Sequence, residues 1–424
     1  MKKKIFALLL ISAWLTVLLT GCGGKNQVVD FEDTNDQIIR ITFFGDKYET
    51  ENVEVIEEII SGFMKENPQI RVSYESMKGA DYYDALKKRM AAGKGNDVFM
   101  VNHDILLDLE KNGQVADLSG LDSIKDYTQE MYSQMEEEGR IYWVPTTVSS
   151  FGLYCNLDLL EEHDMKVPET LPEWMEICSY FASRGITPVI ANNDISLKIL
   201  AIGRGFYSAY QKQRQEEVFE RLNSGEDRLS DYLTEGFAIV KELIDKGYVD
   251  ADKALYTKKT SDDLKEFVKG EYPFMLTGAW AAGRVENMNP GFDFEVAPLP
   301  VLEDGSLLVI NADTRLSVNA SSPQPDAAMK FVEYFTRADN IHRFAFQQSS
   351  FCPLEGGETS VIKAIRPLAA AYEAKRTVIG TDGRLDLPIW TITAGACRML
   401  LSGETLENTM DWMDRQAELE RAGA

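Results

Sequence analysis

The chain has 424 residues, and its composition excludes several classes of protein. Its 68 Asp and Glu residues outnumber its 44 Lys and Arg residues, which gives a formal net charge of -24 at pH 7. Because such a surface repels phosphate backbones and anionic lipid headgroups, we expect no nucleic-acid partner. The 44% hydrophobic content excludes a disordered acidic chain, and the length predicts two lobes that each bury a core.

The N-terminus has the pattern of a bacterial export signal. Three lysines precede the apolar run IFALLLISAWLTVLL, which is shorter than the roughly 20 residues needed to span a bilayer. The run ends in LTGC, the pattern of a lipoprotein signal, or lipobox, after whose cleavage Cys22 carries acyl chains. An ordinary signal peptide with a chance cysteine is the alternative. We predict a signal peptide over residues 1–21, a lipid anchor on Cys22 and a flexible tether over residues 22–37.

Strand and helix patterns alternate in the first part of the body. Strands are predicted at residues 38–44, 70–74 and 97–101. The helices between them are marked by apolar residues at helical spacing, namely Ile56, Ile59, Ile60 and Phe63 in the first helix and Leu86 and Met90 in the second. This order is the one that a mostly parallel α/β sheet requires.

The alternation restarts after residue 140. FGLYC predicts a strand, Asn156 can cap the helix that follows, and Thr170 with Glu173 forms a capping box for a further helix. The strand ITPVIA comes next, residues 207–269 are largely helical, and YPFML and FDFEVAPLP predict more strands. This second round of alternation predicts a second α/β lobe.

Residues just after the predicted strands are candidates for a binding site, because ligands of open α/β sheets bind beyond the carboxyl ends of strands. These candidates are Asp46, Lys47, Asn102, His103, Asp104, Asn192, Asn193 and Trp280. Carboxylates, amides and a tryptophan suit a ligand that is rich in hydroxyl groups. The alternatives are that Asp and Asn serve in turns and helix caps, and that Trp280 is buried in a core under the following helix.

No pattern indicates catalysis, a metal or a cofactor. The three histidines lack metal-ligand spacing, and the G-x-S-x-G and G-x-x-x-x-G-K-[ST] motifs are absent from the sequence. A glycosidase pair can always be found among 68 acidic residues, so it means nothing without geometry. Buried thiols are expected for the scattered cysteines of the body, although export would permit a disulfide; they are Cys155, Cys178, Cys352 and Cys397.

Six segments of the body occur in an order that is specific as a set. They are GNDVFMVNHDILLDLEKNGQVADLS, FGLYCNLDLLEEHDMKVPETLPEW, FVKGEYPFMLTGAW, FEVAPLPVLEDG, LSVNASSPQPDAAMKFVEYFT and LLSGETLENTMDWMDRQAEL. Together with the lipobox, they resemble the lipoprotein solute-binding proteins of bacterial sugar ABC importers, the class that includes maltose-binding protein. The resemblance covers residues 38–420 and is not specific to one substrate.

The resemblance implies an α/β fold with two lobes, of the periplasmic-binding-protein type. Each lobe would be a mostly parallel sheet flanked by helices, and hinge strands would join the lobes. The implied boundaries are 38–148 and 306–350 for the first lobe, and 151–302 and 354–424 for the second. The chain would cross between the lobes near Ser149, Glu303 and Phe351.

The resemblance also gives four candidate residues a place in a ligand cleft. FFGDKY looks like the family's first ligand loop, which implies that Asp46 and Lys47 face the ligand. VNHD resembles the second loop, where Asp104 would accept hydrogen bonds from sugar hydroxyls. Trp280 matches the family's cleft tryptophan.

Three further positions follow from the same resemblance. Trp390 in LPIWTI lies at the matching distance before SGETLENT and is implied to face the ligand. Asn102 stands where the family often has an aromatic residue, which implies a different or thinner stacking surface. Ser149 stands where maltose-binding protein has an acidic residue, which argues against maltodextrin as the ligand.

The remaining tryptophans of the body are expected to be structural or are left open. Trp174, which follows a capping box, is expected in a core, and Trp412 is expected to pack on the last helix. Trp143 lies near the predicted hinge, and its contact with a ligand stays open.

The function that the resemblance implies is binding without chemistry. The protein would be a monomer, anchored by lipid to the extracytoplasmic face of the cell membrane, that captures a sugar or small oligosaccharide and delivers it to an ABC permease. Two alternatives are a sensor that presents its ligand to a receptor kinase and a secreted glycoside-acting enzyme. The sequence does not identify the sugar, and peptides, polyols and phosphorylated compounds are alternative ligands, of which the acidic balance disfavours a strongly anionic one most.

Overall fold

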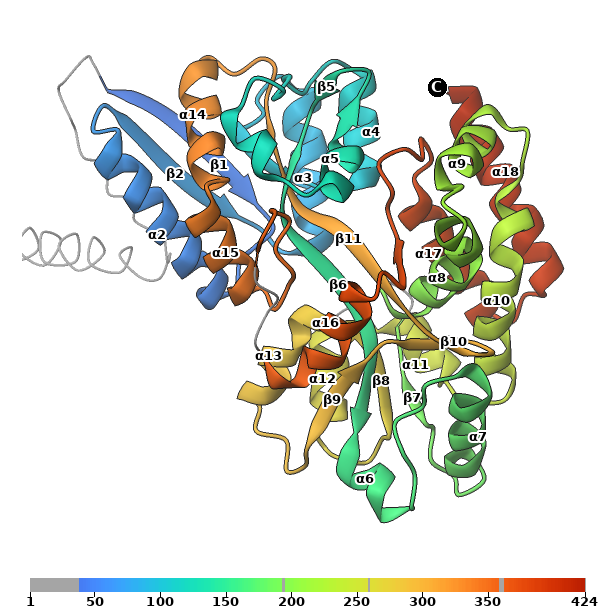
Figure 1. The fold of residues 1–424 in the computed structure, drawn as a ribbon. Coiled ribbons are helices and arrows are strands. Elements are labelled where there is room, and N and C mark those ends of the chain that lie inside the picture. Colours follow the sequence, from blue (N-terminus) through green and yellow to red (C-terminus); the bar gives the residue numbers. More distant parts are fainter. Residues whose placement is uncertain (1–37, 193–194, 258–259, 358–361, 424) are drawn as a thin grey trace, which may run out of the picture. The chain divides into compact units, whose positions relative to one another are not determined.

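The computed structural model describes residues 38–192, 195–257, 260–357 and 362–423 (Figure 1). The predicted signal peptide, the predicted anchor Cys22, the tether and Asn193 lie outside these ranges. Within the ranges, no helix combines the length and the hydropathy that crossing a membrane requires. From Ile39 onward the chain forms one unit, in which the predicted mixed α/β class is confirmed.

In this unit, ten of the described strands form one sheet, with β2, β1, β3, β11, β6, β8 and β7 as neighbours in this order. The strands are β1 (Ile39–Gly45), β2 (Ile70–Ser76), β3 (Val98–Val101), β6 (Val144–Asn156), β7 (Val189–Ile190), β8 (Phe274–Gly278), β9 (Phe294–Ala297), β10 (Leu299–Leu302), β11 (Gly305–Val318) and β12 (Thr377–Ile379). Both ends of the sheet have parallel pairings, of β1 with β2 and β3 and of β7 with β8. The antiparallel pairings of the described sheet all involve β6 or β11, the two long strands that join its ends. Two further strands, β4 (Glu136–Glu137) and β5 (Arg140–Ile141), pair only with each other.

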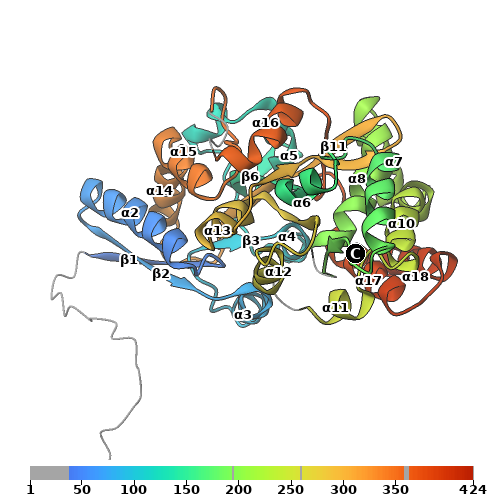
Figure 2. The same ribbon diagram turned by 90° about the horizontal axis from the view of Figure 1, so that it is seen from below.

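Helices cover both ends of the sheet. They are α2 (Thr50–Glu66), α3 (Gly79–Ala91), α4 (His103–Lys111), α5 (Gln129–Met135), α6 (Leu157–Glu162), α7 (Leu171–Ala182), α8 (Ser196–Gln211), α9 (Gln215–Ser224), α10 (Leu229–Asp245), α11 (Ala251–Tyr256), α12 (Thr260–Phe267), α13 (Ala282–Asn287), α14 (Pro325–Phe335), α15 (Ala338–Gln347), α16 (Arg366–Glu373), α17 (Ile389–Leu401) and α18 (Leu406–Gly423). Figure 2 shows α2 on one side of β1 and β2 and α3 on the other. At the other end of the sheet, α8, α10, α17 and α18 pack together.

Local sequence signals set the starts of several helices as predicted. Thr170 Oγ1 accepts a hydrogen bond from Glu173 N, and the Glu173 carboxylate accepts one from Thr170 N, so the capping box of α7 is confirmed. Asn156 Oδ1 accepts a hydrogen bond from Leu159 N at 3.1 Å and caps α6. Such caps satisfy N–H groups that have no acceptor within the helix.

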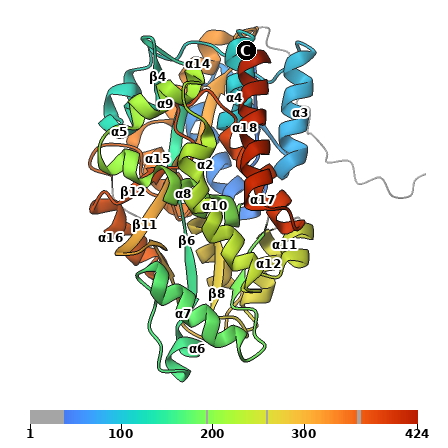
Figure 3. The ribbon, with the colours of Figure 1, turned by 90° about the vertical axis from the view of Figure 1, so that its right-hand side faces the viewer.

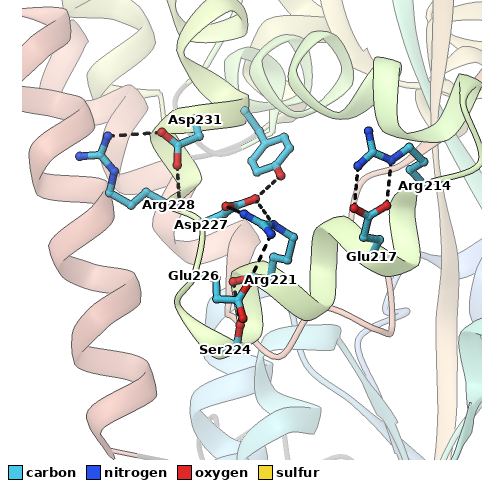
Figure 4. A network of polar contacts seen from close by, with 9 residues as sticks. Arg214, Glu217, Arg221, Ser224, Glu226, Asp227, Arg228 and Asp231 are labelled. Atoms are coloured by element: carbon cyan, nitrogen blue, oxygen red, sulfur yellow. Dashed lines mark hydrogen bonds and ion pairs between the residues drawn. The ribbon is translucent and has the colours of Figure 1, made fainter.

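The turn between α9 and α10 is held by exposed pairs of opposite charge (Figure 4). Arg221 Nη2 lies 2.5 Å from Asp227 Oδ1. The hydrogen bonds that Arg221 and Tyr232 donate to Asp227 lower the pKa of its carboxyl group to about 2. The other pairs are Arg221 with Glu226, Arg214 with Glu217 and Arg228 with Asp231. Each of these arginines is thus paired with a carboxylate, so the turn does not present unpaired positive charge that could bind an anionic partner.

The crossing between the two ends of the sheet occurs where β6 and β11 pair. Ser149 of β6 lies opposite Asn311 of β11, and the neighbouring Val148 forms a bridge with Phe351. Glu303 lies in the hairpin turn between β10 and β11, and β11 then pairs with β6 from Val309 to Leu316. The crossings predicted near Ser149, Glu303 and Phe351 stay predictions.

Candidate functional site

A cavity of about 410 Å³ is lined by residues from both ends of the sheet and from β6 and β11. We call it the central cavity. Eight of the predicted site residues line it, namely Asp46, Lys47, Asn102, His103, Asp104, Ser149, Trp280 and Trp390. A second cavity of about 350 Å³, the adjoining cavity, shares Trp280 with the central cavity and extends to Lys78 and Arg284. Both volumes lie in the range of roughly 300 to 1,000 Å³ that is usual for sites of small ligands.

One described residue among the predicted site residues, Asn192, does not line these cavities. Asn192 is buried, donates a hydrogen bond to Asp263 at 2.6 Å and accepts one from Ile195 N at 2.9 Å. It therefore fixes the chain before α8 and does not line either cavity within the described residues. These two hydrogen bonds give Asn192 a structural role before α8, and its contact with a ligand stays a prediction. Asn193 lies outside the described residues.

Asp46 and Lys47 directly follow β1, at the carboxyl end of that strand. Tyr83 of α3 donates a hydrogen bond to Asp46 Oδ2 at 3.3 Å. Burial alone would lower the pKa of Lys47, but Asp46, Asp313 and Glu49 outweigh it and raise this pKa. The amine is thus charged at neutral pH, and the site presents an acceptor and a donor side by side.

Asn102 and Asp104 begin α4, and both also hold a helix in place. Asn102 Oδ1 accepts a hydrogen bond from Ile105 N at 3.0 Å and caps α4. Asp104 Oδ2 accepts hydrogen bonds from Thr391 N at 2.8 Å and from Thr391 Oγ1 at 2.5 Å, which connects α4 to α17. Asp104 Oδ1 is buried and has no hydrogen-bond partner among the described residues. Asn102 and Asp104, the predicted ligand residues of this loop, therefore also bind backbone N–H groups at the starts of α4 and α17.

Trp280 is partly exposed in a short turn of 3₁₀-helix, Ala279–Ala281, just after β8. Its ring lies over Gly278, where an added Cβ would come within 2.1 Å of the ring. The ring also meets Phe151 edge-on, with 5.2 Å between the ring centroids. Gly278 thus makes room for the tryptophan ring, and Trp280 lines both cavities.

Trp390, the second residue of α17, also packs against Phe151, with 5.6 Å between the ring centroids. Lys198 Nζ lies 3.9 Å from the centroid of the Trp390 ring, and Lys198 is buried. A cation over the face of an indole ring is attracted by its negative face. Phe151, Trp280 and Trp390 together form what we call the aromatic wall of the central cavity.

The floor of the central cavity comes from β6 and β11, and the sequence analysis missed most of it. Besides Ser149, its residues are Thr147, Asn311, Asp313, Thr314 and Arg315. The signal in the sequence is NADTR, a polar run inside the apolar strand GSLLVINADTRLSV. Polar residues in a strand that is buried along most of its length require partners or a ligand.

Arg315 is the largest of these missed residues. Only 2% of the Arg315 surface is exposed. Its Nε donates a hydrogen bond to Ala312 O, and its Nη2 donates one to Thr381 O, both at 3.0 Å. Its guanidinium lies 3.8 Å from the centroid of the Trp143 ring. Burial lowers the pKa of Arg315 to about 10, so it stays protonated at neutral pH. Trp143 is buried under Arg315 and does not line the described cavities.

Other predicted features lie away from the cavities. Trp174 is fully buried in the core, as predicted, and Trp412 packs over Gly395. The four cysteines of the described body are buried and free. The described residues contain no group of His, Cys, Asp and Glu that could hold a metal ion.

Comparisons with known proteins agree with this geometry. A family model for bacterial extracellular solute-binding proteins matches residues 46–341. The chain is 25% identical over 379 residues to the multiple sugar-binding protein of Streptococcus mutans, with 86% of each chain covered. Among solved structures, it resembles a sugar transporter protein of Bacillus licheniformis in complex with stachyose, with a TM-score of 0.69, 20% identity and coverage of 90% of this chain and 100% of the other. A chitin oligosaccharide binding protein has a TM-score of 0.75 at 18% identity, with coverage of 91% and 100%. The similar folds confirm the two-lobed architecture.

Proposed function

Since the chain belongs to the bacterial extracellular solute-binding proteins, we propose that it captures a sugar or a small oligosaccharide and delivers it to the permease of an ABC transporter. The printed names of its relatives support this class of ligand, because they include a multiple sugar-binding protein and a protein in complex with stachyose. The proposed activity is binding and transfer, with no chemical step.

The observation that carries the proposal is the pairing of two unlike walls in the central cavity. Phe151, Trp280 and Trp390 offer flat apolar faces, while Asp46 and Lys47 offer an acceptor and a donor. A sugar ring presents an apolar face of C–H groups and a rim of hydroxyls, so it can use both walls at once. We propose that Asn102, Asp104 and Ser149 add polar contacts to the same ligand.

The test is a thermal-shift screen of the purified protein against mono- and oligosaccharides, including stachyose, raffinose, maltotriose and chitin oligosaccharides. A sugar at 100 times its dissociation constant stabilises the folded state by about 2.7 kcal/mol, which is readily measured. Sugars that shift the melting temperature are then titrated by calorimetry. If no sugar raises the melting temperature, the proposal is wrong. Turnover of any bound glycoside, detected by chromatography of the mixture, would favour the enzyme alternative instead.

We also propose that the two lobes close on the ligand, with β6, β11 and the segment at Phe351 as the hinge. The boundaries near residues 148, 303 and 350 stay predictions, and the pairing of Ser149 with Asn311 supports β6 and β11 as hinge strands. A ligand that contacts both lobes favours the closed form. Small-angle scattering should give a smaller radius of gyration with the bound sugar than without it.

The proposed location is the extracytoplasmic face of the cell membrane, where acyl chains on Cys22 would hold a monomer. The lipobox and the lysines before it support this proposal. In cells that express the full chain, Cys22→Ser should move the protein from the membrane fraction to the soluble fraction. A variant that stays in the membrane fraction would contradict the anchor.

A further inference from the structure

Helix α4 contacts the C-terminal part of the chain at both of its ends. In its first turn, Asp104 accepts two hydrogen bonds from Thr391, and His103 Nε2 donates one to Leu387 O at 3.3 Å. In its last turn, Lys111 donates a hydrogen bond to Gly423 O. The helices α4, α17 and α18 can be followed in Figure 3. Both ends of α4 thus contact residues that lie 284 to 312 positions later in the chain.

The contact of Asp104 is a helix cap supplied from another helix. α17 begins after Pro388, and no side chain of its own first residues caps it. The N–H groups of a first turn have no acceptor within their helix, and a cap normally binds the N–H of the second or third residue. Thr391 is the third residue of α17, and Asp104 Oδ2 accepts its N–H at 2.8 Å. A carboxylate also interacts favourably with the positive end of the helix dipole.

This cap lies at a boundary between cavities. A third cavity of about 530 Å³, which we call the side cavity, is lined by Asp104 and Thr391. Asp104 also lines the central cavity, together with Trp390, the residue before Thr391. Asp104 therefore lines both cavities, and its hydrogen-bond partner Thr391 lines the side cavity.

We propose that Asp104 is a positioning residue that caps α17 from α4, fixes Trp390 in the aromatic wall and closes the central cavity toward the side cavity. This inference rests on the proposed function in one respect, that the central cavity holds the sugar. A ligand longer than the central cavity then extends past Trp280 into the adjoining cavity, and its other end stops at Asp104. Asp104 Oδ1, which has no partner among the described residues, is left for that end of the ligand.

Hydrogen exchange of the unliganded protein tests the cap directly. In the wild type, the amide of Thr391 should be protected, and in Asp104→Ala it should exchange at least about tenfold faster, because a hydrogen bond to a charged group is lost. Asp104→Asn should restore most of the protection, since Asn caps helices as well as Asp does. Asp104→Ser, whose side chain is too short to reach α17, replaces Asp104→Ala if that variant does not fold. The matched control is Asp108→Asn on the same helix, since Asp108 is exposed and pairs with Lys87.

A ¹⁹F NMR spectrum of the protein labelled with 5-fluorotryptophan tests the effect on Trp390. The Trp390 resonance, assigned with Trp390→Phe, should shift in Asp104→Ala and return in Asp104→Asn, while the Trp174 resonance stays in place. An unprotected Thr391 amide in the wild type, or a Thr391 amide and Trp390 resonance unchanged by Asp104→Ala, would overturn the proposal. Because neither measurement needs a sugar, a failure of the cap and a failure of the proposed function are told apart.

Discussion

Among the residues that line the central cavity, polar groups are held by hydrogen bonds from the protein, whereas flat rings are held by packing. Asp46 accepts a bond from Tyr83, and Asn102 caps its own helix. Trp280 and Trp390, in contrast, rest against Phe151. Hydrogen bonds are directional and fix which hydroxyls fit, whereas ring contacts depend on area and tolerate many sugars. The polar residues that line the cavity, such as Asp46 and Asn102, should therefore set specificity for the sugar, and the aromatic wall should supply most of the affinity.

The largest expected effect tests the aromatic wall. Trp280→Ala should weaken binding of the sugar found in the screen on the order of 100-fold, because buried aromatic anchors dominate binding energies. The free energy of unfolding without sugar should fall by less than the ~3 to 5 kcal/mol that a core tryptophan costs, since Trp280 is partly exposed. Calorimetry and urea unfolding measure the two quantities.

The control for this variant is Trp412→Ala, because Trp412 packs over Gly395 and does not line the described cavities. It should lower stability and leave the dissociation constant unchanged. The prediction is contradicted if Trp280→Ala loses the ~3 to 5 kcal/mol of unfolding free energy expected for a core tryptophan while its folded fraction binds sugar normally. Trp280 would then be a core residue and would not contact the ligand.

The next effect is the pH dependence of stability that arises from His103, which begins α4. Burial and the nearby Arg315 lower the pKa of His103 to about 4 in the folded state. The unfolded chain has a histidine pKa of about 6.5, so it takes up a proton first as the pH falls. Stability from His103 is therefore fully present above about pH 6.5 and decreases as the pH falls toward 4, by about 2 kcal/mol between pH 7 and pH 5.

Urea unfolding of His103→Gln and the wild type at several pH values isolates this effect. Glu110 on the same helix acts in the opposite direction, because burial and then Glu137 raise its pKa to about 8, so its stabilising effect decreases as the pH rises from about 4.5 to 8. The difference between the two proteins cancels this second contribution. His342→Gln, at an exposed position, is the control and should follow the wild type. Parallel pH curves for His103→Gln and the wild type would contradict the prediction.

A smaller effect should come from the glycine under Trp280. In Gly278→Ala the new Cβ would lie within 2.1 Å of the tryptophan ring, so the ring must move. Affinity for the sugar should fall about tenfold, or ~1.4 kcal/mol, with a smaller effect than the loss of the whole ring. Gly120→Ala is the matched control, since a Cβ there meets no atom within 4 Å. Equal dissociation constants for Gly278→Ala and the wild type would mean that the ring position is unimportant.

The elements that the sequence predicted well are those set by neighbours in the chain. The caps at Asn156 and Thr170 join residues three positions apart, and both are confirmed. The apolar spacing of α2 likewise identified a buried face. Even the strand before Trp280, predicted at residues 272–276, is displaced by only two residues, as Phe274–Gly278.

The parts that the sequence did not reveal depend on contacts between distant residues. Asn192 binds Asp263, which lies 71 positions later, and no local pattern distinguishes such a bond from a ligand contact. The bond of Asp104 to Thr391 spans 287 positions. Most of the floor of the cavity was missed for another reason, because it lies within β6 and β11, whereas the rule for α/β sheets points to residues beyond the ends of strands. Arg315 lies within β11, where a long strand crosses the site.

The smallest expected effect tests whether a polar residue of the site serves both fold and ligand. Asn102→Ala removes the cap of α4 and should cost ~1 kcal/mol of stability, whereas Asn102→Asp keeps an acceptor for Ile105 N and should keep the stability. Asn102→Asp nevertheless loses the amide donor and adds a negative charge near Asp104, so affinity for the sugar should fall about threefold, at the lower end of what one hydrogen bond contributes. Urea unfolding and calorimetry of both variants separate the two roles. If Asn102→Asp loses as much stability as Asn102→Ala, the capping role is contradicted. If Asn102→Asp binds the sugar with unchanged affinity, Asn102 is a purely structural residue, and the other polar groups of the cavity set specificity.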